Sequence, residues 1–267
     1  MAKGSMGGQR AGGSLSGAGN MQQQINQAQA NQQVQIDDTQ QASAFSTDYN
    51  TFMAMSDDEK ADFISAAVKQ GVPDHLAQND FQKFVYNSGL TDKPDVVDDA
   101  TLNTMNGTEM FRTVNNVYDS KNDLSYNADQ IAKQVMAGRV TRVSDNGGSA
   151  HGRGIYFADN YSNSVNTYGN TRGNVKSTAV MRAKLNNNAR VLNESTGLAG
   201  VRREIASGSK LGKVLSKCDK ESRISIYGMA KGYNVIKDDV WHTGYLVVLN
   251  RNAMTMSSSI KAKSSSW

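Results

Sequence analysis

The chain has 267 residues and a mild basic excess, with 29 Lys and Arg against 25 Asp and Glu and a formal net charge of +4. This length holds one sizeable domain with accessory segments. The basic residues are scattered and form no stripe with interleaved aromatics, which argues against a dedicated nucleic-acid binder. Cys218 is the single cysteine, so the sequence excludes an intramolecular disulfide and a cysteine-based metal site, and it suits a reducing compartment.

No apolar run reaches membrane-spanning length, and the first residues lack the apolar core of a signal peptide. We expect no membrane partner and no export by a signal peptide. Residues 1–45 contain mainly Gly, Ser and Gln, with ten glutamines in residues 21–41. Such a segment buries too little apolar surface to offset its ordering entropy, so we expect a disordered arm. It would serve as a tether or docking arm, or have no role.

A helical subdomain is expected over residues 46–99. Ser56 and Glu59 form a capping-box pattern, and the apolar residues that follow recur on one helical face. A second helix is predicted from Asp74 to Tyr86, with Gly89 ending it. We expect both helices to pack on the domain that follows.

Residues 100–256 mix short strands with helices. Strands are predicted at 110–114, 140–144, 179–185, 235–236 and 245–249, and helices at 127–138, 160–168 and 198–231. The strands are not spaced as regular βαβ units, which favours an α+β domain over a doubly wound sheet. Residues 257–267 are largely Ser and Lys, and we expect them to form a flexible tail.

The most informative segment is the run from Gly152 to Asp159, which reads Gly-Arg-Gly-Ile-Tyr-Phe-Ala-Asp, followed by Ser162, Ser164 and Tyr168. It predicts a glycine-rich approach, a short apolar strand and a polar helix. Ser164 and Tyr168 are four residues apart and therefore share one helical face. Glycine lets a ligand or another backbone come close. The segment is therefore interpreted as one wall of a pocket for a flat, polar-edged ring, or as a buried strand alone.

This run closely resembles the NAD-binding signature of ADP-ribosyltransferases of the poly-ADP-ribose polymerase kind, with Tyr168 one residue further along than in that pattern. The resemblance implies an α+β fold with a split mixed sheet over residues 100–256. It also implies NAD as the substrate and no metal. In the family, the bond between nicotinamide and its ribose breaks through an oxocarbenium-like state.

Roles for single residues follow from the same resemblance. Phe111-Arg112-Thr113 resembles the arginine-bearing first strand of toxin-type ADP-ribosyltransferases. Arg112 would then hold the phosphates or ribose of NAD, and the Thr113 backbone would bond the nicotinamide carboxamide. Taken alone, Arg112 fits a surface ion pair equally well.

The nicotinamide pocket implied by the resemblance takes its other residues from the glycine-rich run and the helix after it. Gly152 and Gly154 would allow close approach, Tyr156 would bound the pocket, Ser164 would bond the amide and Tyr168 would stack on the ring. Arg112 and Tyr156 are the candidate catalytic residues. His151 would line the entrance or be solvated.

The sequence departs from the family at the usual acid, which precedes a late strand in a pattern close to Glu-Tyr-x-Val. Gly244 stands before Tyr245 here. The acids that we considered as replacements are Asp238, Asp239, Glu204 and Glu221. Losing the acid disfavours polymer formation and leaves mono-transfer, NAD hydrolysis or an inactive pocket.

The expected function is an NAD-dependent mono-ADP-ribosyltransferase that modifies a host macromolecule, expected to be a protein, and releases nicotinamide. The alternative is an inactive bacteriophage structural or docking protein that retains the fold. Val248-Leu249-Asn250-Arg251 resembles a strand of phage-encoded ADP-ribosyltransferase-like proteins. This places the expected setting in a virion or the host cytoplasm, with the N-terminal arm contacting phage head proteins.

Overall fold

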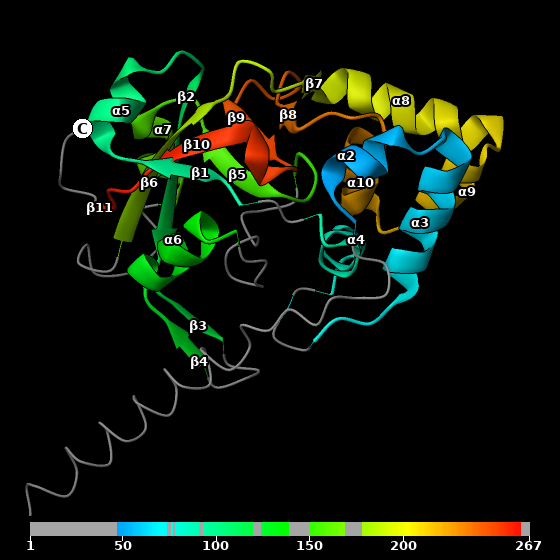
Figure 1. The fold of residues 1–267 in the computed structure, drawn as a ribbon, viewed down its shortest axis with the longest axis horizontal. Coiled ribbons are helices and arrows are strands. Elements are labelled where there is room, and N and C mark those ends of the chain that lie inside the picture. The colour runs from blue at the N-terminus through cyan, green and yellow to red at the C-terminus, as the bar shows by residue number, and fades with distance from the viewer. Residues whose placement is uncertain are drawn as a thin grey trace, which may run out of the picture. The chain divides into compact units, whose positions relative to one another are not determined.

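A computed structural model describes residues 47–73, 76, 78–90, 93–119, 124–138, 150–168 and 178–262. Outside this part lie the expected arm (1–45), the strand predicted at 140–144 and the last residues of the tail. Within the described residues, nine strands form one mixed sheet that helices cover on both faces (Figure 1). The expected α+β class is confirmed.

The helices follow the chain in this order: α2 (Tyr49–Ala54), α3 (Asp57–Lys69), α4 (Asp80–Ser88), α5 (Asp99–Thr104), α6 (Ala128–Met136), α7 (Tyr161–Tyr168), α8 (Glu194–Ser207), α9 (Lys210–Lys217), α10 (Lys220–Ala230) and the 3-10 turn η2 (Arg251–Ala253). The strands are β1 (Asp95–Val97), β2 (Glu109–Asn115), β3 (Val117–Asp119), β4 (Leu124–Tyr126), β5 (Ile155–Ala158), β6 (Thr178–Leu185), β7 (Val191–Asn193), β8 (Val235–Lys237), β9 (Tyr245–Val248), β10 (Met254–Ser257) and β11 (Lys261–Ala262). β3 and β4 form a separate hairpin.

Local sequence signals account for several helix ends. At the start of α3, Ser56 and Glu59 bond each other's backbone as the capping box predicts. The second predicted helix begins later than expected, at Asp80, because the Asn79 side chain caps the helix there by accepting from the Gln82 N–H. Gly89 ends α4 in the left-handed conformation, with φ of 71°.

The strands of the main sheet run in the order β1-β10-β6-β2-β5-β9-β8-β7, with β11 beside β6. The end pairs β1–β10 and β8–β7 are parallel and the internal pairs are antiparallel. β2 pairs with β6 through seven residues, and β5 pairs with β9 through four. Between β2 and β5, by contrast, Phe111 and Ala158 are the one paired position, so the sheet opens beside this pair.

Each face of the sheet has its own apolar core. One face, here the α6 face, packs residues such as Met110, Ile155 and Phe157 against α6. On the other, the α7 face, Phe111 contacts Tyr161 of α7 edge to face, and Tyr156 packs into the core of α3, α4 and α8–α10. The alternation of side chains along β2 and β5 produces this division.

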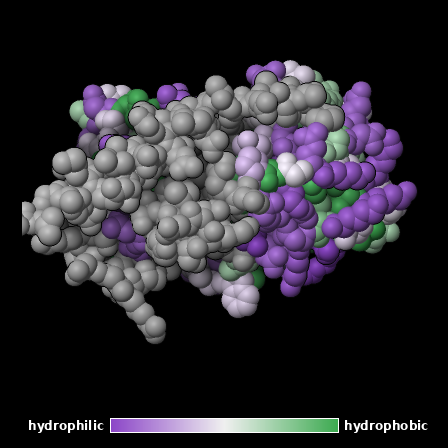
Figure 2. Space-filling view, turned by 90° about the horizontal axis from the view of Figure 1, so that it is seen from below, coloured by the Kyte–Doolittle hydropathy of each residue, from purple (hydrophilic) through white to green (hydrophobic). Residues whose placement is uncertain are grey.

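The helices α2, α3 and α4 of the segment expected over residues 46–99 share this second core. α3 and α4 pack against α9 and α10, and Phe52 of α2 packs against Phe63 and Phe84. In Figure 1 these helices lie together beside the β7–β8–β9 edge, and in Figure 2 their outer surface is mostly hydrophilic. The segment also contributes β1 to the main sheet, where it pairs with β10. At the other end, β11 pairs with β6, so ordered structure continues past residue 256. None of the described helices is both long and apolar enough to cross a membrane.

Candidate functional site

The opening between β2 and β5 gathers most of the residues that the sequence singled out. Past the Phe111–Ala158 pair, the register of β2 with β5 has no further paired position. Arg112 Nη1 donates to the Tyr156 carbonyl across the gap at 3.1 Å. A guanidinium therefore occupies the place where a ladder hydrogen bond would otherwise join the strands. Arg112 is 5 % exposed, so it is not a surface ion pair.

A second bridge closes the α7 face of the same opening. Thr113 Oγ1 on β2 lies 2.8 Å from Ser164 Oγ on α7, and both side chains are buried. Asn160 caps α7 by accepting from the Asn163 N–H, which fixes where the helix begins. The register of α7 then brings Ser164, and not the exposed Ser162, against β2. The two hydroxyls are thus each other's partners inside the protein, and each is able to donate and to accept.

The two glycines before β5 serve the packing of the protein itself. A Cβ on Gly152 would lie 2.7 Å from an Ile224 methyl, and one on Gly154 would lie 2.8 Å from the Val248 carbonyl oxygen. Their φ values of 104° and 154° also favour glycine. Glycine is therefore required at these positions by close packing against α10 and β9. Of the two uses that the sequence left open, this is the approach of another part of the protein.

The Tyr156 hydroxyl holds this glycine turn in place. It donates to the Gly152 carbonyl at 2.7 Å and accepts from the His151 N–H at 3.0 Å. Its ring also lies near those of His151 and Tyr245. Tyr156 therefore anchors the turn through its hydroxyl and lines the base of the opening with its backbone. Tyr168 is the last residue of α7, and its side chain lies outside the described part.

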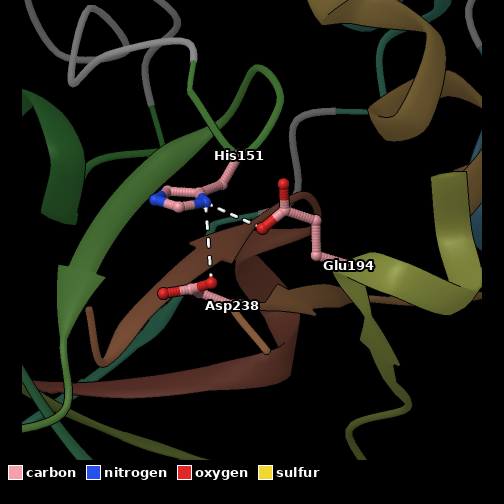
Figure 3. A group of neighbouring side chains, drawn as sticks. All are labelled: His151, Glu194 and Asp238. Atoms are coloured by element: carbon pink, nitrogen blue, oxygen red, sulfur yellow. Dashed lines mark hydrogen bonds and ion pairs between the residues drawn. The ribbon is translucent and has the colours of Figure 1, made fainter. Parts of the chain in front are cut away.

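A buried group of three ionisable side chains lies beside the turn (Figure 3). His151 Nδ1 is 2.8 Å from Glu194 Oε2 and 3.9 Å from Asp238 Oδ1. The three come from the glycine turn, the first position of α8 and the segment after β8. We call this group the clasp, because it ties three separate parts of the chain together. One interpretation of the sequence had His151 solvated. His151 is 4 % exposed, so that interpretation is wrong.

Asp238 shapes the loop 238–244 that leads into β9. Its Oδ1 accepts from the N–H groups of Val240 and Trp241, and its Oδ2 accepts from the N–H and hydroxyl of Thr243. Burial opposes ionisation, but these hydrogen bonds outweigh it and hold the pKa of Asp238 well below its ordinary value. The loop thereby holds His242 at φ 52°, a strained conformation of a kind that concentrates at functional sites.

The clasp offers ligand atoms within 4.8 Å of one another, which is the spacing of a metal site. The hydrogen bonds argue against that use. Each Asp238 oxygen already accepts two bonds, which occupies its two lone pairs. Both ring nitrogens of His151 also have partners in the protein, because Nδ1 bonds Glu194 and Nε2 lies 3.5 Å from the Thr243 hydroxyl. The geometry fits a structural clasp better than a metal centre.

At the place of the family's acid, the chain brings a different carboxylate. A Cβ on Gly244 would lie 2.5 and 2.6 Å from the two carboxylate oxygens of Asp159, and no atoms are closer to that position. The Asp159 N–H also donates to the Gly244 carbonyl at 2.9 Å. Asp159 therefore fills the space that Gly244 leaves.

The four acids that we considered from the sequence are placed elsewhere. Asp238 belongs to the clasp, and Asp239 bonds the N–H and hydroxyl of Ser195. Glu204 bonds Ser209 and pairs with Lys231. Glu221 lies in the first turn of α10. Sequence reasoning missed Asp159 and Glu194, although Asp159 stands inside the quoted signature, because proximity across strands is not written in sequence spacing.

Comparisons of the chain with protein-family models, with curated proteins and with solved structures return no match. Function is therefore inferred from the geometry of the site and from the residues that resemble the ADP-ribosyltransferase signature.

Proposed function

We propose that this protein is an NAD-dependent mono-ADP-ribosyltransferase that transfers ADP-ribose to a host macromolecule and releases nicotinamide. The observation that carries the proposal is the opening between β2 and β5, where one position is paired, Arg112 bonds the Tyr156 carbonyl and Thr113 bonds Ser164. These are the residues that the resemblance assigns to NAD. The split sheet of that family is the finer fold that we propose for residues 100–256.

The reaction requires three kinds of functional group from the protein, and each has a candidate. The carboxamide of nicotinamide needs a donor and an acceptor in fixed places; the resemblance assigns these to the Thr113 backbone and the Ser164 hydroxyl, which the Thr113 hydroxyl bonds at 2.8 Å. The diphosphate needs positive charge in a planar fork, which Arg112 supplies. Departure of nicotinamide leaves positive charge on the ribose, which needs a nearby carboxylate. Binding in the opening holds the reacting groups in orientation.

The proposed biological setting is a bacteriophage particle or the cytoplasm of its host, with a protein as the acceptor. The sequence Val248-Leu249-Asn250-Arg251 supports it through its resemblance to phage-encoded relatives of the fold. The N-terminal arm is the proposed attachment to head proteins.

A second function is favoured by one observation. Gly244 carries no side chain where the family has its acid, so the fold also fits an inactive docking protein of the virion. Such a protein would keep the opening for packing alone.

A binding experiment on α7 tests the proposed pocket. Ser164→Ala removes one of the two hydroxyls and should weaken NAD binding by about 1 kcal/mol, the value of one hydrogen bond. Ser162→Ala removes an exposed hydroxyl two residues away on the same helix and should leave the affinity unchanged. Titration calorimetry measures both, with thermal melts to compare folding. Equal affinity for folded Ser164→Ala and wild type would remove the hydroxyl pair from the pocket, and no binding by wild type would favour the docking protein.

A further inference from the structure

The position of Asp159 is set by three features of the structure. It follows β5 directly, its N–H bonds the Gly244 carbonyl, and its carboxylate lies where a side chain on residue 244 would begin. A larger residue at 244 would collide with that carboxylate, and the φ of 75° at Gly244 favours glycine as well. The position of the Asp159 carboxylate therefore requires glycine, and not an acid, at residue 244.

The carboxylate is oriented but not neutralised. Its Oδ1 accepts from the side-chain amides of Asn160 at 2.8 Å and of Asn163 at 3.2 Å. No basic side chain of the described residues forms an ion pair with it. Asp159 is exposed, so a substrate can reach it, unlike Asp238 and Glu194 in the clasp. Two neutral donors therefore fix the direction of a charge that stays available.

Asp159 also borders the opening. Its neighbour Ala158 pairs with Phe111 at the point where β2 and β5 begin to separate. α7 starts two residues after Asp159 and brings Ser164 to Thr113 at the other side. Asn163, which bonds the Asp159 carboxylate, is the residue next to Ser164, so α7 contacts both the carboxylate and Thr113.

We propose that Asp159 is the catalytic carboxylate of this protein and takes over the role that a glutamate before the last core strand has in the family it resembles. This inference rests on the proposed function. The bond between C1′ of the ribose and the ring nitrogen of nicotinamide breaks, and its electron pair leaves with nicotinamide. Asp159 stabilises the positive ribose, and then accepts the proton of the acceptor group as that group bonds C1′.

Steady-state nicotinamide release and NAD affinity of the full chain test the proposal. Asp159→Asn keeps an oxygen for the two asparagine amides but removes the charge. It should lower turnover by about 10²–10⁴-fold, as for loss of a general base, with NAD affinity close to wild type. Asp159→Glu restores a carboxylate and should release nicotinamide faster than Asp159→Asn. Asp129→Asn, an exposed aspartate in the first turn of α6, is the matched control and should behave as wild type.

The outcomes distinguish failure of the role of Asp159 from failure of the proposed function. Turnover of folded Asp159→Asn within about threefold of wild type, far below the loss expected for a general base, would overturn the role of Asp159 and leave the proposed function standing. Absence of nicotinamide release from wild type that binds NAD would overturn both. A parallel loss in Asp159→Asn and Asp159→Glu, with weakened NAD binding in each, would mean that Asp159 positions α7 and does not act on the substrate.

Discussion

Arg112 is the residue on which the proposed chemistry depends most. It is buried, and it donates to the Tyr156 carbonyl across the point where the sheet opens. A planar guanidinium can bond that carbonyl and still direct other N–H groups elsewhere, whereas an ammonium concentrates its charge at one point. The same group can therefore hold the strands apart and grip phosphate oxygens.

Arg112→Lys should preserve the charge but lose this fork. We expect nicotinamide release to fall on the order of 10²–10³-fold, the range for loss of one preorganised donor. Turnover is measured together with thermal melts, because residue 112 is buried. Arg203→Lys, on the exposed side of α8, makes the same chemical change away from the opening and serves as the control. Equal turnover in folded Arg112→Lys and wild type would exclude Arg112 from the reaction.

At the scale of elements, the loop 238–244 and the glycine turn form one unit joined by the clasp. The loop enters β9, the turn enters β5, and these two strands pair directly. His151 connects them to the first residue of α8 through Glu194. The exposed Trp241 lies at the outer end of this loop, with 68 % of its surface accessible. Loss of the clasp should therefore loosen the border of the opening without dissolving either core.

Asp238→Asn tests how much the bonds of Asp238 to the loop 238–244 contribute to the free energy of unfolding. Asn replaces one acceptor oxygen by a donor, so the bonds from Thr243 or from Val240 and Trp241 are lost. The free energy of unfolding should fall by about 1–3 kcal/mol at neutral pH. The pKa of Asp238 is lowered in the folded protein, so its stabilising effect is complete above the ordinary value of 3.8 and is lost as the pH falls toward the lowered value. The difference between variant and wild type should therefore shrink below about pH 4.

Denaturant unfolding of both proteins across this pH range measures the difference. Asp95→Asn, which alters an exposed carboxylate of β1, is the control and should change stability by no more than about 0.5 kcal/mol. A variant as stable as wild type at neutral pH would show that the loop does not depend on Asp238.

The local elements could be predicted largely from sequence, because their signals are local. The capping box at Ser56, the strand at β2 and the helix at α7 follow from patterns within a few residues. The start of α4 is predicted too early, because the apolar pattern does not show the cap that the Asn79 side chain forms. The clasp and the approach of Asp159 to Gly244 could not be predicted, since each joins residues that are 43 or more positions apart or on different strands.

At the scale of the whole described part, β2 and β5 stand at the centre of a sheet with a core on each face. A central gap is costly, because backbone groups there lose their ladder partners and require replacements. Arg112 supplies a replacement by donating to the Tyr156 carbonyl. This interruption in the pairing of β2 and β5 is the feature on which the proposed binding site depends.

Nicotinamide release by the full wild-type chain tests the proposed transferase activity most directly. The protein is incubated with NAD labelled in its ADP-ribose half, with and without a bacterial lysate, and both free nicotinamide and labelled macromolecules are measured. We expect nicotinamide release that the lysate stimulates, with the label transferred to a macromolecule as single units. A folded protein that releases no nicotinamide under either condition would contradict the proposed activity.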